Sequence, residues 1–263
     1  MTGVLPVALE NATKILQVLL PAGKEYACVM RVHSSVPEDE VREVMGEFVG
    51  EIYQRPPLRS SVRRVVRKRV IYYIRDVEFD DGYVLFRVGC QSGTYIRKLV
   101  FDIGEALGCG AHMAELRRTR AGPFTEDERL VTLYDLEDAY LSWKEEGDES
   151  YLREVVQPME SALLLLPKVY IRDSAVDAVC HGADLAIPGI LRLESGIRPM
   201  DLVGILSGKG EAVALGKALM SSDDMASLDH GLAVKTSRVI MPPGTYARMW
   251  RGEAARPHGE GER

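Results

Sequence analysis

The sequence predicts an α+β protein of two domains, in which a mixed or antiparallel sheet with helices is followed by a small β-barrel. Three observations support this prediction. Residues 1–166 alternate between strand-like and helix-like hydrophobic periodicity. Residues 167–245 contain short apolar runs that glycines interrupt, a pattern typical of small β-barrels. Residues 246–263 are polar and are expected to form a flexible tail.

The first half of the first domain predicts two helices around a strand. Apolar residues recur at helical spacing over 8–20, and 24–33 reads as a strand. The next helix lies within 34–50, with Ser35 as its expected cap and Pro37 at its start.

A hairpin and a third helix complete the sheet region. Two strand-like runs flank Asp80-Asp81-Gly82, a composition that favours a tight turn. The helix is predicted over 93–108, and Gly108 is its stop signal. Its apolar stripe consists of Ile96, Leu99, Val100, Ile103 and Leu107.

The net charge of −6 by itself argues against a nucleic-acid partner. The acidic and basic residues are separated along the chain, however, so one region can be strongly basic although the whole chain is acidic. Residues 125–160 hold 12 acidic and 3 basic residues and are expected to form surface helices. Residues 55–69 hold seven basic residues and no acidic one. Because phosphate contacts act over about 8–10 Å, this local excess is what matters for RNA binding.

Composition also limits the chemistry. The four cysteines, Cys28, Cys90, Cys109 and Cys180, have no CxxC spacing, so neither a zinc site nor a disulfide framework is expected. No apolar run approaches the roughly 18 residues of a membrane helix. We therefore expect a cytoplasmic protein without a metal or another cofactor.

Three stretches together resemble the TruB-type pseudouridine synthases, and most nearly the archaeal Cbf5 type. They are "TGVLPVALENATK" (2–14), "GKEYACVM" (23–30) and "CQSGTYIRKLVFDIGEALGCGAHMAELRRTRAGPF" (90–124). The resemblance continues into "HGADL" (181–185). It implies a partial catalytic domain over 1–166 and a PUA RNA-binding domain over 167–245.

The resemblance also implies the active-site residues. Enzymes of this family detach uracil from ribose at N1 and rejoin it through C5, so the base must leave the helical stack. By this resemblance Tyr26 lies against the base, Arg97 pairs with the catalytic carboxylate, Tyr95 supports the site and Leu116 lines the pocket. From the residues alone, a half-buried strand residue is the favoured interpretation of Tyr26, and an exposed helix residue is the alternative for Arg97.

The catalytic carboxylate of the family is an Asp in a GxxDPxxTGVLP-type segment. Only Met1 precedes Thr2 here, so we expect the given sequence to begin after that residue, as a fragment or from a misassigned start. Asp102 and Glu105 are poor substitutes. Asp102 follows Arg97 by five residues and faces another direction, and Glu105 lies about 12 Å further along the helix.

The resemblance implies RNA contacts at three places. The basic stretch matches a loop that closes on substrate RNA, although a charged sheet edge is the alternative. Arg117, Arg118 and Arg120 extend the same face, and the PUA-like part contributes a further set. The residues are Arg55, Arg59, Arg63, Arg64, Arg67, Lys68, Arg69, Arg117, Arg118, Arg120, Gly182, Ala183 and Asp184.

Two functions remain open from the sequence. The first is an RNA pseudouridine synthase that acts on tRNA, on guided rRNA, or on both. The second is an RNA-binding scaffold of an H/ACA-type ribonucleoprotein without catalysis. The implied partners are tRNA, H/ACA guide RNA, rRNA and small proteins of the Nop10 and Gar1 type; no membrane is implied.

The absence of the Asp gives the first testable prediction. Residues 1–263, supplied with a guide RNA and a uridine-containing target, should form no pseudouridine, because no other carboxylate is placed to act at the ribose. Tritium release from 5-tritiated uridine measures this directly. Measurable turnover would contradict the prediction and would mean that another carboxylate substitutes.

Overall fold

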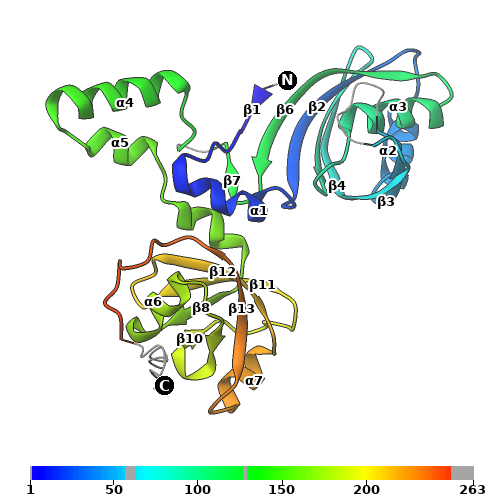
Figure 1. Ribbon diagram of the computed structural model, residues 1–263. Coiled ribbons are helices and arrows are strands. Elements are labelled where there is room, and N and C mark those ends of the chain that lie inside the picture. Colours follow the sequence, from blue (N-terminus) through cyan, green and yellow to red (C-terminus); the bar gives the residue numbers. More distant parts are fainter. Residues whose placement is uncertain (1, 57–62, 127–128, 250–263) are drawn as a thin grey trace, which may run out of the picture. The chain divides into compact units, whose positions relative to one another are not determined.

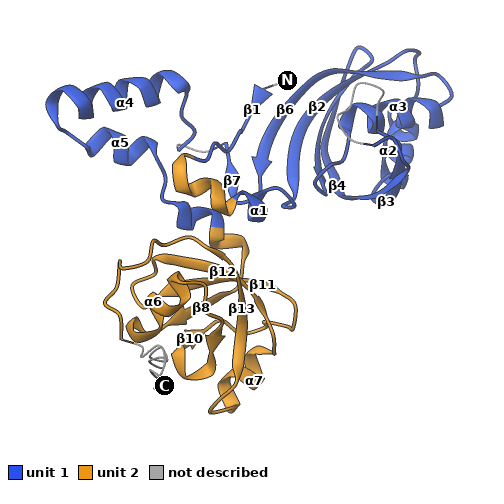
Figure 2. Ribbon diagram, viewed as in Figure 1, with its two compact units in different colours: residues 1–8, 16–162 blue, residues 9–15, 163–263 orange. Residues whose placement is uncertain are grey.

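The computed structural model describes residues 2–56, 63–126 and 129–249. The chain divides into two compact units (Figures 1 and 2). The first contains residues 1–8 and 16–162, and the second contains residues 9–15 and 163–263. The chain thus passes into the second unit, returns to the first, and leaves it again near residue 162.

The first unit is built on a seven-stranded sheet with the order β1-β6-β2-β5-β4-β3, in which β7 pairs with β6. All these pairs are antiparallel except β1 with β6, which is parallel. The predicted mixed sheet is therefore confirmed. The strands are β1 (Thr2–Gly3), β2 (Lys24–Val32), β3 (Gly50–Gln54), β4 (Arg67–Asp80), β5 (Tyr83–Cys90), β6 (Ala111–Ala121) and β7 (Phe124–Thr125).

The predicted hairpin is the connection between β4 and β5. Asp81 and Gly82 form a two-residue loop with φ angles of 41° and 75°. A type I′ turn requires positive φ at both positions, which Asp tolerates better than most residues and Gly adopts freely. The local composition alone therefore sets this turn.

Helices cover one face of the sheet. Figure 1 shows α2 and α3 together, and their contacts place α2 on β4 and α3 on β6. The α3 residues Ile96, Leu99, Val100 and Ile103 are buried, as the apolar stripe predicts. The helices of this unit are α1 (Leu16–Leu19), α2 (Glu38–Glu47), α3 (Ile96–Ala106), α4 (Leu133–Glu146) and α5 (Ser150–Val155).

Two local predictions were wrong. The helix expected over 8–20 consists of a 3-10 helix, η1 (Glu10–Ile15), followed by the single α-turn of α1. Glu10 has a φ of 47°, which no α-helix accommodates. The cap of α2 is Pro37 and not Ser35, and no side chain caps this helix. Three acidic residues in its first turn stabilise the exposed N–H groups instead.

The second unit contains a six-stranded sheet with the order β10-β8-β11-β12-β13-β9. Its core is aliphatic and includes Val169, Ile171, Ile205 and Val213. A connecting 3-10 helix, η2 (Met159–Leu165), precedes it. The elements are β8 (Lys168–Ile171), α6 (Asp173–Cys180), β9 (Leu185–Ala186), η3 (Ile187–Gly189), β10 (Ile190–Leu193), β11 (Leu202–Ser207), β12 (Ala212–Ala218), α7 (Ser222–Ser227) and β13 (Leu232–Val239).

The packing of α3 against β6 gives a testable prediction. A Cβ on Gly104 would lie 2.0 Å from the backbone nitrogen of Ala111, so Gly104→Ala should destabilise the protein by at least about 2 kcal/mol. A Cβ on Gly46, in α2, would have nothing within 4 Å, and Gly46→Ala should stabilise the protein by up to about 1 kcal/mol. Urea unfolding measures both. Equal effects would contradict the close packing of α3 on β6.

Candidate active site and RNA-binding residues

Tyr26 lies on the central strand β2, between β5 and β6. It is half-buried and packs against the core cluster that contains Cys28 and Met30. Burial raises the pKa of its hydroxyl, and the guanidinium of Arg118 offsets part of that rise. The phenol is therefore protonated at neutral pH.

Arg118 connects Tyr26 to the start of the chain. Its Nε donates to the carbonyl of Val4 at 2.6 Å, and Val4 N donates to the carbonyl of Arg118 at 2.8 Å. Gly3 permits this approach, since a Cβ there would lie 2.1 Å from the Arg118 carbonyl oxygen. The segment "TGV" is thus fixed to β6, the strand that also pairs with Tyr26. Arg118 was predicted as an RNA contact, and its guanidinium also serves this internal role.

Leu116 and Tyr26 belong to the same face of the sheet. Leu116 pairs with Cys28 in the ladder, and Arg118 pairs with Tyr26. Leu116 is partly buried against the core cluster. Directly opposed residues in a ladder share a face, so Leu116 is placed on the face that Tyr26 presents.

Tyr95 and Arg97 stand at the start of α3. Tyr95 is the N-cap residue, and both ends of the Gln54 side chain bond to its backbone. Arg97 is exposed in the first helical turn. Within the described part of the chain, no hydrogen bond or ion pair involves the Arg97 guanidinium, and none joins it to Tyr26.

The two carboxylates nearest to Arg97 in sequence are not bonded to it. Asp102 accepts from Lys98 on the same helix. Glu105 is exposed. Lys98 therefore engages Asp102, and the expectation that neither carboxylate acts on the ribose stays a prediction.

Lys24 was not singled out by the sequence, although it lies two residues before Tyr26. Its ammonium donates to the carbonyls of Leu19, Leu20 and Ala22 at 3.2, 2.8 and 2.7 Å. Burial lowers the pKa of Lys24, and the charge of Arg118 lowers it further. These carbonyls end α1, where a cation complements the helix dipole.

The basic stretch divides into exposed and engaged residues. Arg55 and Arg63 are exposed, and Arg64 is exposed with its Nε 3.4 Å from the carbonyl of Pro56. Lys68 pairs with Glu51 at 2.5 Å. Arg67 reaches the carbonyl of Arg63 at 3.4 Å, Arg69 donates to Gly93 O at 3.1 Å, and Arg59 lies outside the described residues.

The other predicted arginines of this unit lie on β6. Arg117 pairs with Glu126 at 2.5 Å. Arg120 donates to the hydroxyl of Tyr73 at 3.2 Å. Both therefore have internal partners, and half of the Arg117 side chain remains exposed.

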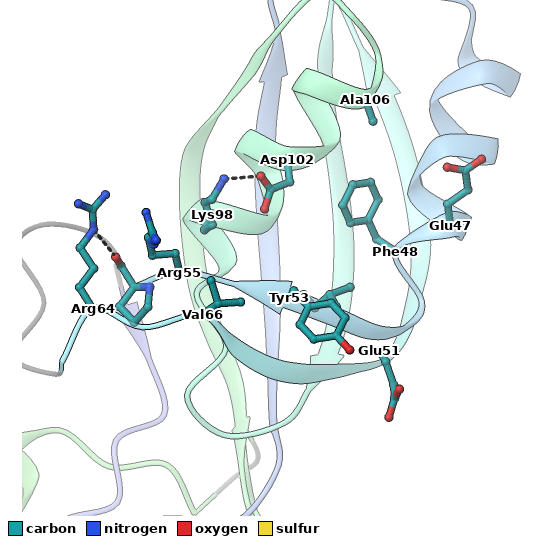
Figure 3. A pocket seen from close by; sticks show the side chains of 12 residues that line it. Glu47, Phe48, Glu51, Tyr53, Arg55, Arg64, Val66, Lys98, Asp102 and Ala106 are labelled. Carbon is teal, nitrogen blue, oxygen red and sulfur yellow. Dashed lines mark hydrogen bonds and ion pairs between the residues drawn. The ribbon is translucent and has the colours of Figure 1, made fainter.

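A groove of about 830 Å³ lies beside the exposed arginines (Figure 3). Its floor is apolar and includes Phe48 and Ile52. Its rim carries three cations, Arg55, Arg64 and Lys98, and three carboxylates, Glu47, Glu51 and Asp102. An apolar floor with both signs of charge suits a protein surface better than a phosphate backbone.

The predicted PUA contacts follow α6. Gly182 has a φ of 90°, and nothing lies within 4 Å of the Cβ that another residue would carry. Thr236 N donates to Asp184 Oδ1 at 2.9 Å, and Thr236 Oγ1 donates to the carbonyl of Ala183 at 2.8 Å. The turn is therefore fixed to β13, and its backbone at Gly182 is open.

Glu25 is the residue that sequence reasoning missed. It is 6% exposed and lies on the face of β2 opposite Tyr26. Its carboxylate accepts from Tyr73 and Thr119 at 2.6 and 2.8 Å and from Arg75 at 2.9 Å. The only available signal was a glutamate beside the apolar stretch "YACVM" of the same strand.

The pKa of Glu25 reflects these partners. Burial raises it, but the hydrogen bonds from Tyr73 and Thr119 and the charges of Arg75 and Arg120 outweigh burial. The carboxyl pKa is therefore held below its ordinary value. The carboxylate connects β2 to β4 and β6, because Tyr73 and Arg75 lie on β4 and Thr119 on β6.

Comparison with known proteins identifies the family. The probable tRNA pseudouridine synthase B of Methanopyrus kandleri is 62% identical over 249 residues, which are 95% of this chain and 73% of that protein. The chain belongs to the TruB family of pseudouridine synthases. The corresponding protein of Thermococcus gammatolerans is 60% identical over 95% of this chain and 75% of its own length.

Family models and solved structures agree with this TruB assignment. The C-terminal domain of tRNA pseudouridylate synthase B matches residues 97–164, a PUA domain matches 167–240, and the Pus10 C-terminal model matches 5–108. A Cbf5–Nop10–Gar1 complex superposes with a TM-score of 0.85 at 60% identity, over 91% of this chain and 73% of that one. An H/ACA ribonucleoprotein bound to a substrate RNA containing 2′-deoxyuridine gives 0.88 at 56% identity, over 94% and 75%. The chain is thus a pseudouridine synthase of the Cbf5 type with a PUA domain.

The buried carboxylate of Glu25 gives a testable prediction. Glu25→Gln should lower the free energy of unfolding at pH 7 by about 2–4 kcal/mol, because the amide keeps only one acceptor oxygen, turns an NH2 group toward donors, and removes the charge that faces two arginines. The contribution is fully present above the unfolded pKa and is lost as pH falls through the lower folded pKa. The difference between the two proteins should therefore shrink in acid.

Urea unfolding at pH 7 and at successively lower pH measures this effect. The matched control is Glu149→Gln, because Glu149 is an exposed partner of Arg153 within one helix turn. It should change stability by less than about 0.5 kcal/mol. A Glu25→Gln protein as stable as the control would contradict the assigned role.

Proposed function

We propose that Tyr26, Leu116, Tyr95 and Arg97 form the uridine site of this pseudouridine synthase. The observation that carries the proposal is Arg97. Its guanidinium is exposed in the first turn of α3, where a cation opposes the helix dipole, and no described residue bonds to it. This position is unfavourable for a cation, which indicates a functional requirement for it. A guanidinium group can hold a carboxylate through two parallel hydrogen bonds.

Tyr26 supplies the surface against which an extruded base would stack. Its ring is half-buried against the core cluster, and Arg118 pairs with it in the ladder between β2 and β6. Leu116 provides an apolar wall on the same face. A flipped base requires an aromatic or apolar contact of this kind, since it loses its neighbours in the stack.

In this proposal, the RNA backbone contacts the exposed cations of the basic stretch, residues 55–69. Arg55, Arg63 and Arg64 are exposed and have no carboxylate partner among the described residues, so their charge is available to phosphates. The open backbone at Gly182 offers a second contact in the PUA domain. Arg67, Lys68, Arg69, Arg117 and Arg120 contribute charge while they hold internal partners.

The substrates and partners follow from the relatives. Because close relatives are named as tRNA pseudouridine synthases and solved ones occur in H/ACA ribonucleoproteins, we assign both tRNA and guided rRNA to the substrate class. Nop10 and Gar1 accompany the related Cbf5 chain, and proteins of this type are the proposed partners. The groove in Figure 3, with its apolar floor and mixed charges, is a surface where a protein partner would fit.

A scaffold without catalysis is the second candidate. It is favoured by one observation, that neither Asp102 nor Glu105 is bonded to Arg97. Under this alternative the RNA contacts persist and no base is extruded.

We place the protein in the cytoplasm. The thiols of Cys28, Cys90, Cys109 and Cys180 are all free, as expected in a reducing compartment. No helix among the described residues is long and apolar enough to cross a membrane.

The RNA-binding proposal is tested by salt dependence. Arg63→Ala with Arg64→Ala should weaken the binding of a single-stranded RNA and reduce the slope of log affinity against log salt by about one unit for each lost phosphate contact. Fluorescence anisotropy at several salt concentrations measures both quantities.

A charge-matched control separates local contact from net charge. Lys144→Ala with Arg153→Ala removes two positive charges from the acidic helices α4 and α5 and should leave the slope unchanged. If the arginine pair behaves like this control, the basic stretch is a charged sheet edge and not an RNA contact.

A further inference from the structure

Gln54 is a buried amide whose carbonyl oxygen and amide nitrogen both bond to one residue of the proposed active site. It ends β3 and is 2% exposed. Its Oε1 accepts from Tyr95 N at 2.9 Å, and its Nε2 donates to Tyr95 O at 3.2 Å. The two bonds fix both the position and the direction of the Tyr95 peptide groups.

These bonds act at the start of α3. Tyr95 is the N-cap and has no side-chain capping bond, while its carbonyl accepts the first helical N–H groups, those of Lys98 and Leu99. Gln54 therefore does from a neighbouring strand what a capping side chain normally does within the helix. The first turn of α3 carries Arg97, and it begins at Tyr95, whose backbone is bonded to Gln54 of β3.

Arg69 holds the same segment from the adjacent strand. Its Nε donates to the carbonyl of Gly93 at 3.1 Å. Gly93 has a φ of 79°, and a Cβ there would lie 3.1 Å from the Arg69 guanidinium. Gln54 pairs with Arg67 and Ile52 pairs with Arg69 in the β3–β4 ladder, so both supports come from one pair of strands.

We propose that Gln54, assisted by Arg69, is a positioning residue that sets the direction of Tyr95 and Arg97 toward the uridine. The inference rests on the proposed function of Arg97. The two bonds to Tyr95 and the bond to Gly93 cross from β3 and β4 to the turn before α3, with no covalent connection nearer than 24 residues for the closest pair. These side chains therefore add to the packing of α3 in fixing where Arg97 lies.

A consequence is that the residues proposed to bind RNA and those proposed to contact the base are both positioned by β3 and β4. Arg55 follows Gln54 directly, and Arg67 and Lys68 precede Arg69. In the proposed complex, phosphates that contact these cations lie at the ends of β3 and β4. The same strand ends hold the Gly93–Tyr95 turn. Removal of the Gln54 amide should leave the phosphate contacts intact and impair only the groups that act on the base.

The experiment compares Gln54→Leu with the unsubstituted chain. Leu removes both hydrogen bonds and keeps a buried side chain of similar volume. Gln17→Leu, at an exposed position of α1, is the matched control. Gln54→Glu serves as a second variant if the Leu protein does not fold, because Glu keeps the acceptor for Tyr95 N and loses the donor to Tyr95 O.

The probe is an RNA hairpin with one loop uridine beside a 2-aminopurine, whose fluorescence rises when its neighbour leaves the stack. The unsubstituted chain and Gln17→Leu should raise the fluorescence on binding. Gln54→Leu should bind within about twofold of the same affinity with the same salt slope, because its phosphate contacts remain. It should give less than about half of the fluorescence increase, since displacement of a positioning contact by about 1 Å weakens action on the base.

A full fluorescence increase in the Gln54→Leu protein would overturn the inference. A uniform loss of affinity, in parallel with lower thermal stability, would also overturn it, since a merely structural role predicts that pattern. These outcomes concern Gln54 alone, because the unsubstituted chain extrudes the base in each of them.

If the unsubstituted chain binds without any fluorescence increase, the proposed base site fails, and hydrogen–deuterium exchange decides the inference separately. Amides of 94–99 should then exchange at least about tenfold faster in Gln54→Leu, as expected for two lost hydrogen bonds, while those of 28–32 stay unchanged. Equal exchange at 94–99 would overturn the positioning role.

Discussion

The register of β2 between β5 and β6 is the constraint on which the first unit depends. Both neighbours pair with β2 along its length, so each residue of β2 is committed to one face. Tyr26 faces the helices and the core, and Glu25 faces the other way. A slip of one residue would bury Tyr26 among arginines and place the carboxylate in the core. The hydrogen bonds to Glu25 from Thr119 on β6 and from Tyr73 on β4, the strand beyond β5, oppose such a slip.

The arginines of the chain divide by what their guanidinium groups contact. Arg118 donates to Val4, Arg69 donates to Gly93, and Arg120 donates to Tyr73. Arg55 and Arg63 are exposed and have no carboxylate partner in the described ranges. Under the proposed function, the same residue type thus supports the uridine site and supplies charge for RNA. A planar group with five donors can bridge several carbonyls or bind phosphate, and burial decides which of the two occurs.

Residues that are close together in this sequence do not always belong to the same unit. Leu9–Ile15 belongs to the second unit, where Lys14 donates to the carbonyl of Ile240 at 3.2 Å. The segments before and after it belong to the first unit. Thr2–Val4 is held by β6, so the stretch from residue 2 to residue 15 serves both units. A division by chain order alone cannot describe such an arrangement.

The sequence by itself determined the features that depend on neighbouring residues. The apolar stripe of α3, the Asp81–Gly82 turn, the change to a second β-rich domain and the motifs of the family were all readable, because helical spacing, turn chemistry and motif spacing act within about twenty residues. Only the tertiary structure determines which side chains hold the residues of the proposed site in place. Gln54 reaches Tyr95 across 41 positions, Tyr73 and Thr119 reach Glu25 across 48 and 94, and Arg118 reaches Val4 across 114. A buried polar side chain must find its partner wherever the packed chain places one, and no local pattern specifies that place.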